Sequence, residues 1–311
     1  MTVAETVHCD LCGSDQATEL HRLRDRYHDL PGDFALQRCR NCGLIYLSPR
    51  PTLESIAAYY PAAYDNYRHR SIADEPFFLM RWMRQQKLTQ RRRFVERRWK
   101  RAPGTLLDVG CSTGLFLHEM RSHRWQGFGV ELSTEAAGYA RNRFGLTVFE
   151  GDFLGVSLEP ASVDVVTFWD VLEHTHSPGM QLARAAEWLR PGGAVVISVP
   201  NWGSLDRHLF GEFWQGLDPP RHLFVFSEAH LASYLSRAGF ELLHSACFAP
   251  GYFSFAMSVE RWLKSVDLRL SGAVRRFLAV PGVRIPLIPW FALLNAVKAG
   301  PILTVYARKV V

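Results

Sequence analysis

The sequence contains no long apolar run and no repetitive tract. No stretch of uncharged apolar residues reaches the roughly 18 residues that a membrane-spanning helix needs. The N-terminal residues lack the basic start and apolar core of a secretory signal, and we find neither internal repeats nor low-complexity segments. These absences predict an ordinary globular protein of the cytoplasm, where paired cysteines bind metal more often than they form disulfides.

Charge is spread unevenly along the chain. The net charge of the 311 residues is +6, but residues 68–101 alone carry 12 Lys and Arg against 3 Asp and Glu. Such a segment binds nucleic acid, anionic lipid or a phosphorylated substrate, or it is a solvated helix face whose apolar residues pack against a core. No RNA-binding motif accompanies it.

Three regions differ in their sequence pattern. Residues 1–50 hold two cysteine pairs in short, loop-rich structure, and residues 51–102 are predicted to form a helical, basic linker or cap. From residue 103 to 311, short apolar strands alternate with helical segments, which is typical of a doubly wound α/β sheet. The predicted strands span residues 105–109, 127–131, 146–149, 163–169, 194–199, 240–248 and 302–309.

A glycine-containing turn follows the first predicted strand. It reads Asp108-Val-Gly110-Cys-Ser112-Thr-Gly114, and glycines there let the backbone approach a ligand at the carboxyl edge of the sheet. The next strand ends at Glu131, an acid placed to accept hydrogen bonds from ribose hydroxyls. The turn also fits the G-x-S-x-G nucleophile elbow of hydrolases, but that elbow follows several earlier strands and leaves Asp108 and Glu131 without a role.

The ordered set of motifs from about 103 to 248 resembles class I S-adenosylmethionine-dependent methyltransferases. The turn resembles their acid-x-Gly-x-Gly-x-Gly signature, with serine at the middle glycine, and similar matches occur in the turn after strand three, in the strand-four motif and in the turn before strand five. The resemblance implies a Rossmann-like seven-stranded methyltransferase sheet with S-adenosylmethionine as cofactor. It implies a cofactor site formed by Asp108, Gly110, Ser112, Gly114, Glu131, Asp152, Phe153 and Trp169.

Two C-x2-C pairs occur in the N-terminal region. Cys9 and Cys12, with Cys39 and Cys42, supply four thiolates for one tetrahedral Zn²⁺, and a glycine follows each second cysteine. Two disulfides or free thiols are the alternatives. The pattern resembles the zinc-binding segment that precedes the methyltransferase domain in sugar C-methyltransferases, whose substrate we do not carry over.

Four residues are candidates for the acceptor side. His174 follows strand four and His222 lies in an aromatic, proline-rich loop over 200–226, so that either could be the general base for an oxygen acceptor, or a structural histidine. Asp170, Glu173 and His174 share one face if this segment is helical. With His222 they resemble the metal site of small-RNA 2′-O-methyltransferases, which implies Mg²⁺ or another divalent ion; the segment also resembles that of ubiquinone-pathway O-methyltransferases.

The leading functional prediction is O-methylation of a small molecule, a sugar or a lipid-linked glycoconjugate. The alternatives are an RNA methyltransferase that uses the basic helix and the zinc module to hold RNA, and a non-catalytic cofactor-binding module. Residues 250–299 have helical periodicity and form an insertion before the last strand, far longer than a hairpin needs. This insertion is expected to be a lid, a homodimer interface or a peripheral contact with the inner face of the membrane.

Overall fold

A seven-stranded sheet forms the centre of the computed structural model, which describes residues 3–60, 72 and 77–310. The strand order is β12-β13-β10-β9-β6-β7-β8, and β13 runs antiparallel to both of its neighbours. The order confirms the predicted Rossmann-like, doubly wound sheet. Its strands are β6 (Thr105–Val109), β7 (Gln126–Glu131), β8 (Thr147–Glu150), β9 (Val163–Trp169), β10 (Leu189–Pro200), β12 (Phe240–Ala246) and β13 (Ile302–Lys309).

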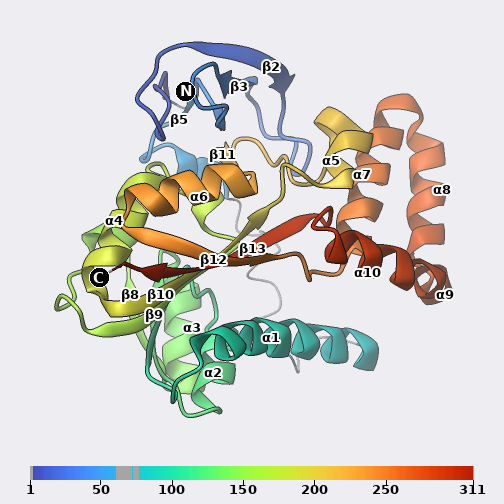
Figure 1. The fold of residues 1–311 in the computed structure, drawn as a ribbon. Coiled ribbons are helices and arrows are strands. Elements are labelled where there is room, and N and C mark those ends of the chain that lie inside the picture. Colours follow the sequence, from blue (N-terminus) through green and yellow to red (C-terminus); the bar gives the residue numbers. More distant parts are fainter. Residues whose placement is uncertain (1–2, 61–71, 73–76, 311) are drawn as a thin grey trace.

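Helices cover both faces of this sheet (Figure 1). Because successive side chains of a strand point to opposite faces, Leu106 and Val165 enter one hydrophobic core while Leu107 and Val166 enter the other. Both faces of the central strands are therefore buried, as the nearly continuous apolar sequence of β9 predicts. One face is covered by α1 (Phe78–Trp99), α2 (Leu115–Arg121) and α3 (Thr134–Phe144), and the other by α4 (Pro178–Trp188) and α6 (Glu228–Arg237).

The N-terminal region forms a second, four-stranded sheet in the order β11-β4-β3-β2. Strands β2, β3 and β4 come from the cysteine-containing segment, but β11 (Phe224–Val225) comes from the loop that follows β10 of the central sheet. The two parts of the chain therefore share a sheet. The other members are β2 (Ala17–Leu23), β3 (Phe34–Cys39) and β4 (Ile45–Leu47), and a separate pair joins β1 (Ala4–Glu5) to β5 (Arg50–Pro51).

Two segments differ from the sequence prediction. The predicted helical linker over 51–102 is α-helical at 78–99, the 3-10 turn η1 (Ile56–Tyr59) precedes this helix, and 61–71 and 73–76 lie outside the described residues. The expected loop over 200–226 contains α5 (Leu205–Phe210), the 3-10 turn η6 (Gly211–Phe213) and β11. Short elements of this kind carry too few residues for a periodic pattern to be recognised.

The insertion between β12 and β13 is helical, as predicted. It contains α7 (Gly251–Val266), α8 (Leu268–Ala279), α9 (Pro281–Arg284), the 3-10 turn η7 (Ile285–Leu287) and α10 (Ile288–Ala296), all at one end of the molecule (Figure 1). Among the described residues no single helix is long and apolar enough to cross a membrane. One pair, Leu268–Leu278 with Gly282–Ala296, satisfies that criterion by length and composition but is bent by 85°.

Candidate active site and metal centre

The turn after β6 has the backbone conformation that a close ligand requires. Gly110, Ser112 and Gly114 all have positive φ, at 66°, 50° and 79°. A Cβ atom on Gly110 would lie 2.5 Å from Val171, and one on Gly114 would lie 2.5 Å from Leu146, so neither position accepts a side chain. Ser112, at the place of the family's middle glycine, adopts the left-handed conformation in spite of its side chain. The serine therefore preserves the backbone conformation of the turn.

Two buried acids lie beside this turn. Glu131 at the end of β7 accepts hydrogen bonds from the backbone amides of Ser112 (2.8 Å) and Ser133 (2.9 Å). Asp108 is 3% exposed and accepts a hydrogen bond from the Thr167 hydroxyl at 2.6 Å. Burial raises the pKa of both carboxyls, that of Asp108 to about 7. These acids and the strained turn fit a ligand that carries hydroxyl and ammonium groups.

The remaining predicted cofactor residues have different surroundings. Asp152 accepts a hydrogen bond from the Leu154 amide and so caps the 3-10 turn η4 (Phe153–Gly155). Phe153 is buried and packs edge-on against Phe168 and Trp188, which places its ring in the hydrophobic core. Trp169 is also buried, against Phe116 of α2.

Helix α1 contributes an arginine that the motifs do not indicate. The Arg91 guanidinium donates to Asp170 at 2.5 Å and lies 4.7 Å from the centre of the Trp169 ring. A cation thus faces the end of β9. A local signal exists, because Arg91 follows the buried Leu88 by three residues and precedes the buried Val95 by four, which puts it on the inward face of the helix.

The expected grouping of Asp170 with the other acceptor-side candidates is wrong. Asp170 has a φ of 60°, so no regular helix runs through it, and the 3-10 turn η5 (Leu172–His174) begins two residues later. Burial opposes ionisation of Asp170, but Arg91 and Lys87 outweigh it and lower the pKa of the carboxyl. Asp170 is therefore held as the carboxylate partner of α1.

Glu173, His174 and His222 do converge. Each offers a ligand atom, and these atoms lie within 4.8 Å of one another; the two imidazole rings are 4.7 Å apart. Nδ1 of His174 lies 3.0 Å from the Arg221 carbonyl oxygen, and Nδ1 of His222 lies 2.9 Å from that of Gly216. A carbonyl only accepts, so each Nδ1 carries a proton and each Nε2 presents a lone pair.

Burial determines the charge of this cluster. Burial and the neighbouring His222 lower the pKa of His174 to about 3, and burial likewise lowers the pKa of His222. Both rings are therefore neutral near pH 7. Burial and the charge of Asp170 raise the pKa of Glu173, whose Oε2 atom has no hydrogen-bond partner among the described residues.

The N-terminal region supports this cluster through Arg221. The guanidinium is fully buried and donates to Asp25 of the N-terminal region and to Asp218, each at 2.7 Å. Because its own carbonyl oxygen binds His174 and its neighbour in sequence is His222, this arginine fixes the backbone that carries both imidazoles.

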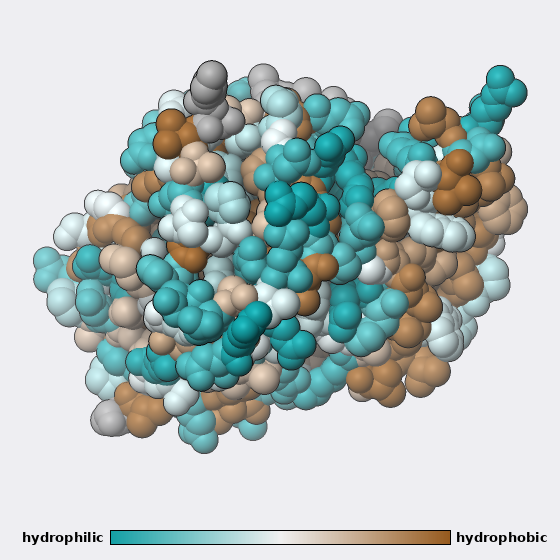
Figure 2. All heavy atoms as spheres, turned by 90° about the horizontal axis from the view of Figure 1, so that it is seen from above, coloured by the Kyte–Doolittle hydropathy of each residue, from teal (hydrophilic) through white to brown (hydrophobic). Residues whose placement is uncertain are grey.

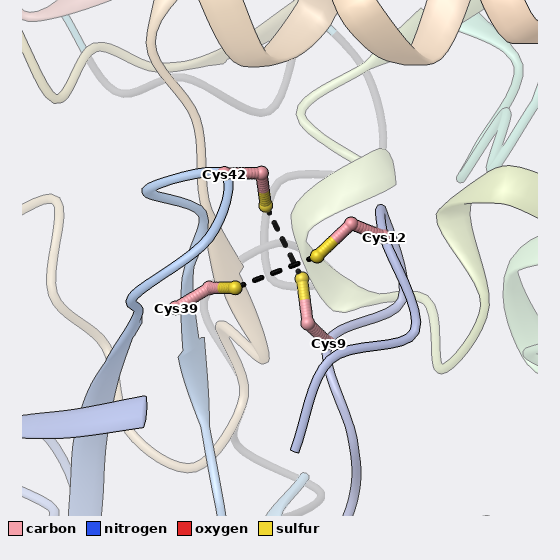
Figure 3. A group of neighbouring side chains, drawn as sticks. All are labelled: Cys9, Cys12, Cys39 and Cys42. Atoms are coloured by element: carbon pink, nitrogen blue, oxygen red, sulfur yellow. Dashed lines mark hydrogen bonds between the residues drawn. The ribbon is translucent and has the colours of Figure 1, made fainter. Parts of the chain in front are cut away.

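The four predicted cysteines come together in the N-terminal region (Figure 3). The Sγ atoms of Cys9 and Cys42 are 3.4 Å apart, and those of Cys12 and Cys39 are 3.5 Å apart. All four lie within 4.8 Å of one another and none forms a disulfide. A tetrahedral ion with Zn–S bonds of about 2.3 Å would separate its sulfurs by roughly 3.8 Å, so the donor set fits zinc.

The fold and the cofactor turn together define a class I methyltransferase fold. Magnesium protoporphyrin IX methyltransferase from Synechocystis PCC 6803, solved with S-adenosylhomocysteine, has a TM-score of 0.52 at 14% identity over 81% of this chain and 97% of its own. The 1,6-didemethyltoxoflavin-N1-methyltransferase of Burkholderia thailandensis has a TM-score of 0.51 at 18% identity over 93% and 100%. At such identities the similarity establishes the fold.

The sequence comparison establishes the family. The methyltransferase domain model matches residues 80–245, more than half of the chain, and the protein belongs to that family. Ubiquinone biosynthesis O-methyltransferases are similar as well. That of Burkholderia lata is 37% identical over 113 residues, which are 33% of this chain and 47% of the relative, and that of Azoarcus sp. is 35% identical over 102 residues, which are 31% and 44%. The chain thus spans about half the length of the curated relatives it matches.

Proposed function

We propose that this protein transfers the methyl group of S-adenosylmethionine to a hydroxyl oxygen of a small molecule. The observation that carries the proposal is the pair of histidines, His174 and His222, whose Nδ1 atoms contact carbonyl oxygens and whose Nε2 lone pairs are presented just beyond the end of β9. An oxygen acceptor must lose its proton, and a neutral imidazole accepts one. The relatives named as O-methyltransferases support oxygen as the acceptor atom.

The cofactor would bind at the turn after β6. Glu131 would accept hydrogen bonds from ribose hydroxyls, and the glycines leave room for the backbone to approach the ligand. Arg91 supplies a cation at the pocket for the carboxylate of the methionine portion. When bound, S-adenosylmethionine supplies an activated methyl group on its sulfonium.

The chain's own residues then handle the proton. The acceptor hydroxyl would give its proton to Nε2 of one histidine, and its oxygen would take the methyl group that the sulfonium supplies. The Nδ1–carbonyl bonds hold the imidazoles in the required tautomer. Asp218 lies beside Arg221 and His222 and, as a carboxylate, stabilises the imidazolium that forms.

Transfer of labelled methyl groups tests this role. The protein is incubated with labelled S-adenosylmethionine and a panel of phenolic, saccharide and lipid-linked acceptors. With the acceptor so found, His174→Ala and His222→Ala should each lower turnover by roughly 10²–10⁴-fold if that ring is the general base. His123→Ala, at the exposed end of α2, is the matched control and should retain full activity. Unchanged turnover in both test variants would contradict the proposal.

A divalent metal held by Glu173, His174 and His222 is the second candidate. The Glu173 Oε2 atom, which has no partner among the described residues, and the ligand atoms that the two histidines place within 4.8 Å favour it, because buried polar atoms without a partner are rare in folded proteins. Two imidazoles and one carboxylate suit Zn²⁺, Mn²⁺ or Fe²⁺ better than Mg²⁺. Such an ion would lower the pKa of the acceptor hydroxyl. Chelator should then abolish activity even where the cysteine cluster keeps its zinc, and one of these metals should restore it, whereas with a general base chelator acts only through that zinc.

Two further points complete the proposal. We place a structural zinc ion on Cys9, Cys12, Cys39 and Cys42, so metal analysis should give one zinc per chain, and Cys39→Ser protein should lose it.

An RNA substrate is less well supported, because α1 directs part of its charge inward: Arg91 pairs with Asp170 and Arg92 with Glu119.

A further inference from the structure

The helical insertion exposes an unusual amount of apolar surface. Its large apolar side chains lie in α7 to α10 and in the turns between them, and Figure 2 shows them gathered at one end of the molecule. About half of the exposed large apolar residues in the described chain belong to this segment. They are Phe253, Trp262, Val266, Leu268, Leu270, Phe277, Val280, Ile285, Ile288, Trp290, Leu293 and Val297. A soluble protein rarely leaves so large a patch uncovered.

The second half of the same segment is basic. After Asp267, the last acid of the sequence, five basic residues and no Asp or Glu follow up to residue 299, and the acid within α7, Glu260, pairs with Lys264. On α8, Arg269 and Arg276 are seven residues apart, so they line up on one side of the helix. Leu270 and Phe277 form a second line next to them, and all four residues are exposed. Apolar side chains flanked by arginines are complementary to a surface that has an apolar interior and anionic groups at its boundary with water.

The inward faces of these helices are already occupied. Arg261 of α7, a candidate for the basic complement of this face, is buried and donates to the carbonyl oxygens of Trp214 and Leu217. Phe291 of α10 is also buried, against Tyr252 and Phe255. The insertion is thus anchored to the body of the protein on one side, and the outer helix α8 packs on α7 on the side that faces away from the central sheet (Figure 1).

We infer that the outer face of α7 to α10 is a docking surface for an anionic lipid bilayer. A lid would turn this face toward the acceptor pocket, but α8 packs on α7 and α9 instead. A symmetric dimer would bring the same patch of both copies together, and with it their unpaired arginines, which repel. A bilayer surface accepts the aromatic and aliphatic side chains between its headgroups and offers phosphates to Arg269 and Arg276. If the proposed methyl transfer is correct, the acceptor is one that resides in or on the membrane.

Vesicle flotation tests the inference without any methyl transfer. The full chain is mixed with vesicles of phosphatidylcholine alone, or of phosphatidylcholine with 30% phosphatidylglycerol, at low and at high salt. We expect it to float with the anionic vesicles at low salt, and high salt to weaken this binding, because counterions screen the arginines. Leu270→Ser with Phe277→Ser should abolish flotation, and Arg269→Gln with Arg276→Gln should weaken binding by about fivefold per arginine.

Matched variants and a second measurement complete the test. Leu53→Ser with Met180→Ser removes exposed apolar residues elsewhere, and Arg124→Gln with Arg143→Gln removes exposed charge on another face; both should float like the unchanged protein. Circular dichroism verifies that each variant is folded. Absence of flotation with anionic vesicles at low salt would overturn the inference. So would a dimer in sedimentation that Leu270→Ser with Phe277→Ser dissociates, since the face would then bind a second copy. A failure here leaves methyl transfer to a soluble acceptor unaffected.

Discussion

Asp108 shows how one residue can tie stability to pH. Its pKa in the folded protein is about 7, above the ordinary 3.8, because burial disfavours the charged form. Between these two values the folded state holds a proton that the unfolded state has lost. The contribution of Asp108 to the stability of the free protein should therefore fall as pH rises from about 4 to about 7 and then level off.

Asp108→Asn removes this titration but can still accept the hydrogen bond from Thr167. The variant should be more stable than the unchanged protein, and its advantage should grow by roughly 2–3 kcal/mol between pH 5 and pH 8. Denaturant unfolding without cofactor at the two pH values measures this. An advantage that is the same at both would show that Asp108 does not titrate in this range.

At the residue scale, the sequence predicted some site members and missed others for clear reasons. The four cysteines and the two histidines were found because motif spacing and strand ends bring such residues together. Asp170 was misplaced because a positive φ turns the chain before Glu173, and sequence spacing alone does not reveal that turn. Arg91 reaches the site from a separate helix, through packing that no local motif encodes.

At the scale of elements, the ion pair between Asp25 and Arg221 joins the N-terminal region to the loop over 200–226. Both side chains are fully buried, so Asp25→Asn would leave the guanidinium with Asp218 as its one remaining carboxylate. Breaking a buried ion pair on one side typically costs about 3–5 kcal/mol. We expect the variant to lose roughly 3 kcal/mol of unfolding free energy, measured with denaturant.

The loss should extend to catalysis, because Arg221 carries the carbonyl that orients His174. Under conditions in which the variant remains folded, turnover should fall while cofactor affinity is unchanged, since the Glu131 site is formed by other elements. Asp33→Asn, on an exposed pair in the same N-terminal region, is the control. Equal losses of turnover in both variants would argue against a specific link.

Strands were predicted more accurately than the connections between them. The spans 163–169 and 302–309 agree with β9 and β13 residue for residue, because long apolar runs leave little choice of conformation. The two-residue strand β11 was missed. Its existence depends on the open edge of β4, which lies about 180 residues earlier in the sequence, and such non-local pairing leaves no local pattern.

For the whole molecule, the cysteine cluster stabilises more than its own region. Tyr234 of α6 donates to Asp10 at 2.9 Å, and β11 pairs with β4, so the region that holds the cysteine cluster is tied to the rest of the methyltransferase domain. Removing zinc should lower the thermal midpoint by about 10 °C or more and reduce turnover together with it. Calorimetry before and after chelation, followed by zinc restoration, measures both effects. An unchanged midpoint after verified metal loss would mean that the sulfurs are not the source of this stability.

The shared sheet also sets an order of events during synthesis. Ile45 of strand β4 is synthesised early, but its pairing partner in strand β11, Val225, is added to the chain 180 residues later. At about 5–20 residues per second, the nascent chain carries this uncovered strand edge for roughly 10–40 s. An open edge of that kind invites pairing with other chains. Production of this protein should therefore be sensitive to chaperone supply and to the speed of translation between these two strands.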